Sequence, residues 1–231
     1  DHRDLHLSIR RQRQMCIRDS SYSGADVSNY SVTDQSSTTA NITAKSLTVS
    51  GITASDKTYD GSVTATMNSS SAVYSGFVSG DDFAGSYSGV FANANVGTGK
   101  TINITSSYSG ADAGNYTVTD QSTPTANKTA KVLTATASAS NKTYDGGTTA
   151  TTTLTFSGLV GSETLGQSVA STFDNKNVGT SKTVTVNSIT LANGSNGGLA
   201  ANYSISTGQT MTANVTAKPL TVSGITTSNK T

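Results

Sequence analysis

From Ser21 onward the chain has no cysteine, no histidine and a single glutamate, and tryptophan is absent from all 231 residues. Without cysteine, this part of the chain can form neither a disulfide nor a thiolate metal site. Without histidine as well, a Ser-His-Asp or Cys-His catalytic group cannot be assembled from it. We therefore expect that the chain is not an enzyme and needs no cofactor.

Apolar and charged residues are also scarce. Hydrophobic residues make up 33% of the chain and aromatic residues 6%, which favours several small β-units over one large core. No apolar run reaches the ~18 residues of a membrane span. From Ser21 onward, 10 lysines face 11 acidic residues, so the net charge is −1. We expect no nucleic-acid partner, because this composition offers no basic patch for phosphate binding.

The first twenty residues differ from everything that follows. Residues 1–20 hold all five arginines, both histidines (His2 and His6) and the single cysteine, Cys16. One interpretation is a basic targeting segment, but the apolar stretch of a signal peptide is missing. The favoured interpretation is a non-native segment, because RQRQMCIRDS looks like translated sequencing-adaptor read-through. We therefore assign these residues no function.

The rest of the chain is an internal repeat with a period of 86–87 residues. The pair Asn-Tyr recurs at 29–30, 115–116 and 202–203, and Thr-Ala-Lys ends at Lys45, Lys131 and Lys218. The predicted organisation is the end of a truncated repeat (21–45), two complete repeats (46–131 and 132–218) and the start of a further truncated repeat (219–231). The chain is thus expected to be a fragment of a longer array.

Within each repeat, apolar residues alternate with polar ones. Examples are Leu47 and Val49, Ile102 and Ile104, and Val184 and Val186. This period of two, rich in Thr, Val, Ile and Tyr, predicts half-buried antiparallel strands. We expect an all-β tandem array of small β-sandwich-like (Ig-like) domains, with a β-solenoid as the alternative. Because Thr-Ala-Lys leads into the next strand without a flexible linker, the predicted array is an elongated rod.

The order of the motifs resembles a known family. KTYDG is followed by SGFVSGDDF or SGLVGSETL, then by NVGT and KT, then by Asn-Tyr and TAK-x-LT. This series resembles the YDG-type repeat of large bacterial surface and secreted proteins, which look like filamentous-haemagglutinin-type exoproteins and adhesins. The resemblance covers essentially all of residues 21–231. It implies a secreted or cell-surface location and often export by two-partner secretion.

Few residues offer chemistry. The Tyr-Asp-Gly motif is either a metal-binding or acid site, or a turn in which Asp bonds the backbone and Gly accepts a positive φ, and we favour the turn. The calcium candidates are Asp81, Asp82 and Glu163, but Thr164 replaces Asp82 in the second repeat, which favours solvated loop charges. NVGTGKT is no phosphate-binding loop, because Ala94 stands where a glycine is required.

Two functions remain open. The favoured one is a structural stalk that projects the binding region of an adhesin, with neighbouring repeats as its partners. The alternative is that the repeats themselves bind host or surface glycan or protein. The residues that recur in both repeats are expected to be structural: Tyr59, Asp60, Gly61, Asn95, Gly97, Asn115 and Tyr116, with Tyr144, Asp145, Gly146, Asn177, Gly179, Asn202 and Tyr203.

Overall fold

The computed structural model describes residues 22–33 and 39–230, so the segment 1–20 lies outside the described residues. The fold is all-β, as predicted. The described residues contain three short 3-10 helices, η1 (Val27–Asn29), η2 (Ala113–Asn115) and η3 (Ala200–Asn202). They form two compact units, one made of 22–33, 39–50, 72–86 and 107–121 and the other of 51–71, 87–106 and 122–230. This division crosses the first repeat, and the boundaries 46–131 and 132–218 stay a prediction.

The first unit contains one three-stranded sheet. Its central strand β1 (Lys45–Ser50) pairs antiparallel with β6 (Val73–Ser75) and parallel with β9 (Tyr116–Thr119). Leu47 and Val49 are buried while their neighbours along β1 are exposed, which confirms the alternation expected for this strand.

The second unit contains the remaining sheets. Two have five strands, in the orders β3-β10-β8-β7-β4 and β12-β18-β16-β15-β13, one has the order β14-β11-β17, and β2 pairs with β5. Strands β7 and β8 give residues to both units.

The bounds in the first repeat are β2 (Thr53–Ala54), β3 (Lys57–Thr58), β4 (Thr64–Ala65), β5 (Met67–Asn68), β7 (Ala84–Phe91), β8 (Gly97–Ser109) and β10 (Thr125–Thr129). Those in the second are β11 (Lys131–Ala139), β12 (Lys142–Thr143), β13 (Thr149–Ala150), β14 (Thr152–Ser157), β15 (Leu165–Phe173), β16 (Gly179–Asn193), β17 (Tyr203–Ile205) and β18 (Thr210–Thr216).

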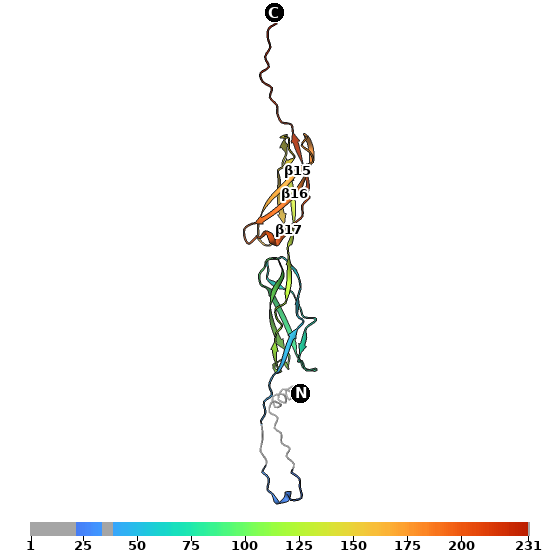
Figure 1. The fold of residues 1–231 in the computed structure, drawn as a ribbon, viewed down its shortest axis with the longest axis vertical. Coiled ribbons are helices and arrows are strands. Elements are labelled where there is room, and N and C mark those ends of the chain that lie inside the picture. The colour runs from blue at the N-terminus through green and yellow to red at the C-terminus, as the bar shows by residue number, and fades with distance from the viewer. Residues whose placement is uncertain (1–21, 34–38, 231) are drawn as a thin grey trace, which may run out of the picture. The chain divides into compact units, whose positions relative to one another are not determined.

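The two repeats have the same strand order. The sheet β6-β1-β9 corresponds to β14-β11-β17, and the two five-stranded sheets match strand for strand. The long hairpin of β15 and β16 is labelled in Figure 1 and pairs from Leu165↔Asn193 to Phe173↔Val184, with one irregularity in register after Ala170. The sequence period therefore returns as a repeated strand order.

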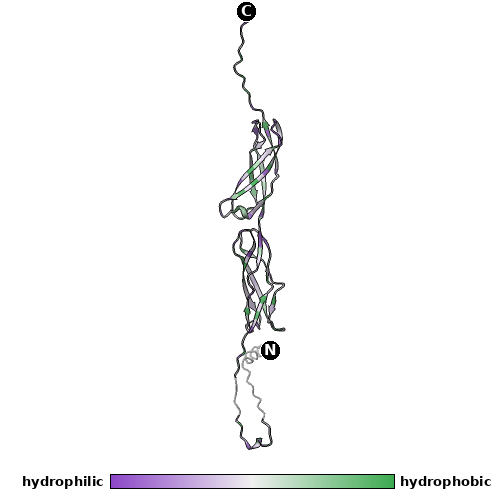
Figure 2. Cartoon of the chain, viewed as in Figure 1, coloured by the Kyte–Doolittle hydropathy of each residue, from purple (hydrophilic) through white to green (hydrophobic). Residues whose placement is uncertain are grey.

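Small apolar cores lie beneath the five-stranded sheets. In the first repeat the core consists of Ala65, Phe91, Ile102 and Ala126. In the second it consists of Ala150, Phe173, Val184, Ala213 and Val215. Green and purple segments are interspersed along the strands in Figure 2, as expected when one face is buried and the other solvated.

The pairing directions differ from the sequence prediction in one respect. The strands were predicted to be antiparallel, yet β1 pairs parallel with β9 and β3 parallel with β10, and the second repeat has the same parallel pairs, β11 with β17 and β12 with β18. Alternating hydrophobicity reports which face of a strand is buried but says nothing about the direction of its neighbour. Parallel partners need a long connection, and here most of each repeat provides it.

Candidate functional site

The Tyr-Asp-Gly motif forms a turn in both repeats. Asp60 Oδ1 accepts a hydrogen bond from the Ser62 backbone N–H at 3.0 Å, and Asp145 Oδ1 accepts one from Gly147 N–H at 2.9 Å. The glycines between them have positive φ, 78° at Gly61 and 86° at Gly146. A side chain that bonds the backbone two residues ahead, followed by a glycine in the left-handed region, accounts for the Asp-Gly pair.

The lysine three residues before each aspartate completes the turn. Lys57 Nζ lies 2.7 Å from Asp60 Oδ2, and Lys142 Nζ lies 2.8 Å from Asp145 Oδ1. Both lysines also donate to a backbone carbonyl across the turn, that of Thr64 or Thr149, at 2.9 Å. The lysine and the aspartate of KTYDG therefore form an ion pair that closes the turn.

The first repeat adds a second, buried lysine. Lys128 is 1% exposed, lies 3.4 Å from Asp60 Oδ1, and donates to the Ser62 carbonyl. Its Nζ also lies 5.4 Å from the centre of the Phe91 ring. Burial lowers the pKa of Lys128, while Asp60 opposes that shift. Partial burial raises the pKa of Asp60, but the bonds from Lys57 and Ser62 outweigh it and hold this pKa well below its usual range.

The tyrosine of the first turn reaches into the second repeat. Tyr59 Oη donates to Glu163 Oε1 at 2.6 Å, and Tyr203 Oη donates to Glu163 Oε2 at 2.7 Å. The two rings meet edge to face, with centroids 5.3 Å apart, and Tyr203 in turn accepts the Val160 N–H at 2.9 Å. Tyr59 and Tyr203 are 4% and 5% exposed. One carboxylate therefore joins the Tyr-Asp-Gly tyrosine of one repeat to the Asn-Tyr tyrosine of the next.

Amide bonds and close packing add to this contact. Asn202 is 1% exposed; its Oδ1 accepts the Val96 N–H at 2.9 Å and its Nδ2 donates to Asn95 Oδ1 at 3.1 Å. A Cβ on Gly61 would lie 2.9 Å from the side chain of Val160, so this position also needs glycine for space. We call this set of residues the junction: Tyr59, Gly61, Asn95, Val96, Val160, Glu163, Asn202 and Tyr203.

Stability at high pH should depend on the junction. Burial, reinforced by Glu163, raises the pKa of Tyr59 to about 12, and burial raises the pKa of Tyr203 in the same direction. Below pH ~10 the phenols are protonated in both states; between pH ~10 and 12 only the unfolded chain releases the Tyr59 proton. We expect the urea midpoint to fall with pH in this window, and to fall less steeply in Tyr59→Phe. Equal slopes for both proteins would contradict this assignment.

The calcium candidates have other partners. Asp81 accepts the hydroxyl of Tyr116, Asp82 Oδ2 accepts the Ala111 N–H at 3.0 Å, and Glu163 accepts the two phenols of the junction. Within residues 22–33 and 39–230, no group of three His, Cys, Asp or Glu side chains could hold a metal ion. Each carboxylate thus serves a protein donor in this structure.

The Asn-Val-Gly loops are tight turns between strands. Gly99 has φ 57° and donates its N–H to Asn127 Oδ1 at 2.9 Å, while Ser181 has φ 51° and donates to Asn214 Oδ1 at 2.8 Å. Asn93 Oδ1 accepts a bond from Lys100 Nζ at 2.6 Å within the first loop. The lysine of NVGTGKT thus bonds within its own turn. Gly97 and Gly179 begin β8 and β16, and Asn177 donates its N–H to Asn175 Oδ1.

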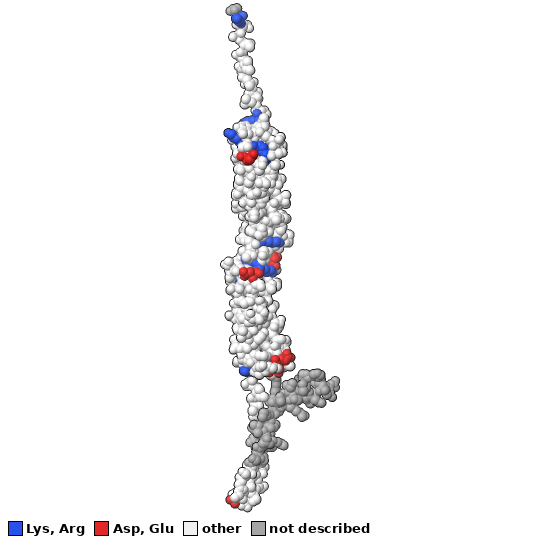
Figure 3. Space-filling view, turned by 90° about the vertical axis from the view of Figure 1, so that its right-hand side faces the viewer, with Lys and Arg blue, Asp and Glu red and all other residues white. Residues whose placement is uncertain are grey.

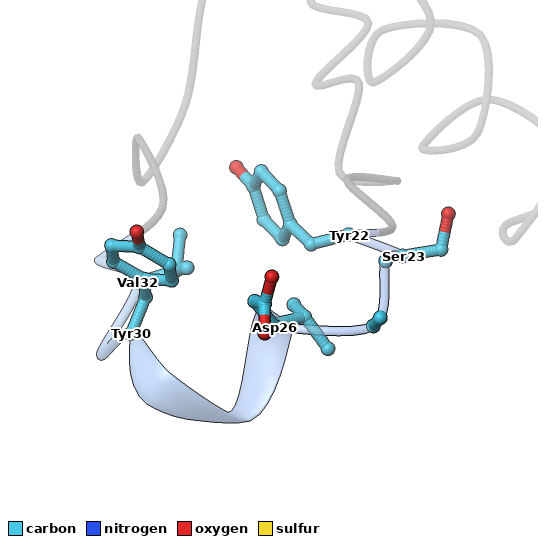
Figure 4. A pocket seen from close by; sticks show the side chains of 8 residues that line it. Tyr22, Ser23, Asp26, Tyr30 and Val32 are labelled. Atoms are coloured by element: carbon cyan, nitrogen blue, oxygen red, sulfur yellow. The ribbon is translucent and has the colours of Figure 1, made fainter.

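The described surface offers little else. In Figure 3, basic and acidic side chains gather in a few places and large areas in view carry no charged residue. Figure 4 shows a hollow beside η1, lined by residues of one exposed segment, among them Tyr22, Asp26 and Tyr30. Its single charged residue, Asp26, forms no constellation for catalysis or metal binding. No helix among the described residues is long and apolar enough to cross a membrane.

Comparison with known proteins gives the family. The family model described as YDG domain matches residues 43–125 and again 129–213, which together are most of the chain. The chain belongs to the YDG domain family. No curated protein and no solved structure matches it. The matches confirm that the chain carries two YDG domains in series.

Sequence reasoning missed the roles of four residues: Lys57, Lys142, Lys128 and Glu163. The pairing lysines Lys57 and Lys142 could have been found, because each stands three residues before the aspartate in both copies. Lys128 could have been found as well, because a lysine stands here at a position where the other copies have the apolar residues Ile42 and Val215. Nothing in the sequence indicates that Glu163 lies between two tyrosines, because these partners are 104 and 40 residues away.

Proposed function

We propose that the YDG domains of this chain are structural spacer repeats of a large bacterial secreted or cell-surface adhesin, which hold a binding region away from the cell. The junction is the observation that supports this proposal most directly. Between β10 and β11 only Ala130 lies outside a strand, and Glu163 bonds tyrosines from both repeats. A short connection with buried bonds on both sides restricts rotation between neighbours, which a spacer requires.

The proposed role requires no catalytic group, cofactor or metal. The buried polar side chains of the junction bond one another. The family resemblance to filamentous-haemagglutinin-type exoproteins supports the adhesin part of the proposal and its secreted or surface location. The partners expected for a spacer are the neighbouring repeats.

Solution scattering on chains of two, three and four repeats tests the spacer. If every junction is held as the one at Glu163 is, the maximum dimension should grow nearly in proportion to repeat number, and EDTA should change neither it nor the melting temperature. A chain with free rotation at the junctions would grow closer to the square root of repeat number. Square-root growth would therefore overturn the stiff spacer.

One observation favours the alternative, in which the repeats bind a glycan. Phe77 is 38% exposed and its ring stacks at 24° on that of Tyr116. Exposed aromatic faces are suited to sugar rings. Sugar binding by the intact chain that disappears in Phe77→Ala would favour this alternative over the spacer.

A further inference from the structure

One end of the first repeat carries an open surface of aromatic and acidic residues. We call it the acceptor surface and define it by Phe77, Val78, Asp81 and Tyr116, which belong to the first unit. Phe77 and Val78 are 38% and 41% exposed. Tyr116 donates to Asp81 and accepts the Val78 N–H at 3.0 Å.

The same surface in the second repeat is covered. Leu159, Val160, Glu163 and Tyr203 stand at the corresponding positions, and Tyr203 bonds Glu163 and Val160 as Tyr116 bonds Asp81 and Val78. There the cover is the end of the preceding repeat, because Tyr59 and Val96 pack against this cluster. The structure thus shows what kind of surface fits an acceptor: a Tyr-Asp-Gly turn beside an Asn-Val-Gly loop.

The second repeat presents such a turn and loop without a cover. We call it the donor surface and define it by Tyr144, Gly146 and Val178. Val178 is 55% exposed, whereas its counterpart Val96 is half-buried in the junction. A Cβ on Gly146 would meet nothing within 4 Å, whereas one on Gly61 would meet Val160. The Tyr144 hydroxyl corresponds to the Tyr59 hydroxyl that donates to Glu163.

The sequence that follows the donor surface also indicates another YDG repeat as the partner of this surface. Residues 219–231 agree with 46–58 at 10 of 13 positions. Leu220, Val222 and Ile225 are 91%, 69% and 81% exposed, although their counterparts Leu47, Val49 and Ile52 are at most 2% exposed. The chain beyond the donor surface therefore has the sequence of the strand that opens a YDG domain.

We propose that the acceptor and donor surfaces are complementary half-sites, and that the occupant of each is the opposite end of a second copy of this repeat pair. In that contact Tyr144 of one copy donates its phenol to Asp81 of the next, Gly146 makes room for Val78, and Val178 packs beside Phe77. In this contact Asp81, which is shorter, takes the position that Glu163 has in the junction. Phe77, which is bulkier, takes the position of Leu159. The inference rests on the proposed spacer function in one respect, since it names the partner that a spacer repeat binds.

A joined chain tests the proposal. Residues 46–218 are appended directly after Lys218, so that a second repeat pair follows the first through the same Thr-Ala-Lys connection. Tyr144→Phe in the first pair should leave the urea midpoint of the original chain unchanged and lower that of the joined chain. Asp81→Asn in the appended pair should lower it as well, because the amide keeps one acceptor oxygen where the two phenols of Tyr116 and Tyr144 would need two.

Tyr59→Phe is the matched control. It removes a phenol that already bonds Glu163, so it should lower the midpoint in the original and the joined chain alike. If Tyr144→Phe has no effect in the joined chain while Tyr59→Phe lowers both midpoints, the complementary half-sites are overturned and the spacer junction stands. If Tyr59→Phe lowers neither midpoint, the junction itself carries no stability, and the proposed function loses its support together with this inference.

Discussion

Replacing Glu163 by alanine is expected to lower the free energy of unfolding by about 2–4 kcal/mol, because it leaves two buried phenols without their acceptor. Tyr59 and Tyr203 are both almost fully buried, and each donates to a different oxygen of this carboxylate. Water reaches such hydroxyls poorly, so the lost bonds are not replaced. Urea unfolding followed by circular dichroism measures the change.

Two variants make this result specific. Glu163→Gln keeps one carbonyl oxygen for a phenol and should cost less than alanine. Asp174→Ala removes a carboxylate that is 46% exposed and lies 3.0 Å from Lys182; water screens this carboxylate, so the substitution should cost less than Glu163→Ala. If Glu163→Ala costs no more than Asp174→Ala, the junction does not hold the two repeats together.

The second large effect concerns Lys128 and Asp60. Asp60→Ala should lower the free energy of unfolding by about 1–3 kcal/mol, since it leaves the buried ammonium of Lys128 with less compensation and also removes the turn bond to Ser62. Asp60 is 43% exposed, so the cost stays below that of breaking a fully buried pair. Lys128→Val should be neutral or stabilising, because valine occupies this position in the core of the second repeat, at Val215.

The double variant separates the two contributions. If the cost of Asp60→Ala comes partly from the uncompensated lysine, that part should vanish in Lys128→Val/Asp60→Ala, and the two substitutions should be non-additive. Additive effects, or a loss of stability on Lys128→Val alone, would show that the lysine is held by contacts other than Asp60.

Local features of the fold could be predicted from the sequence because they depend on neighbours in the chain. The alternation at Leu47 and Val49 predicted a strand with one buried face, and both residues are buried in β1. The phase of the repeats predicted that the same elements return, and the same strand order does return. Such features rest on periods of a few residues or on identity between copies.

Features that depend on distant partners could not be predicted in this way. The direction of β9 beside β1 was missed, since the strands lie far apart in the chain and alternation is the same for either direction. The sequence places Glu163 among solvated loop charges, because the carboxylates of this loop differ between the repeats. Glu163 corresponds to Asp81, and Thr164 corresponds to Asp82. Its role depends on Tyr59, whose partner is set by the packing of one repeat against the next.

The parallel pairs have a mechanical consequence. In the second repeat, β11 and β12 near the beginning lie parallel to β17 and β18 near the end. A tension applied to the two ends of the repeat would pull these neighbouring strands in opposite directions along their own length. Their ladder bonds are then loaded in shear and must break together, whereas a hairpin pulled at its open end would unzip one bond at a time. The parallel pairing of these strands, which alternating hydrophobicity does not reveal, is therefore suited to bearing a load along the chain.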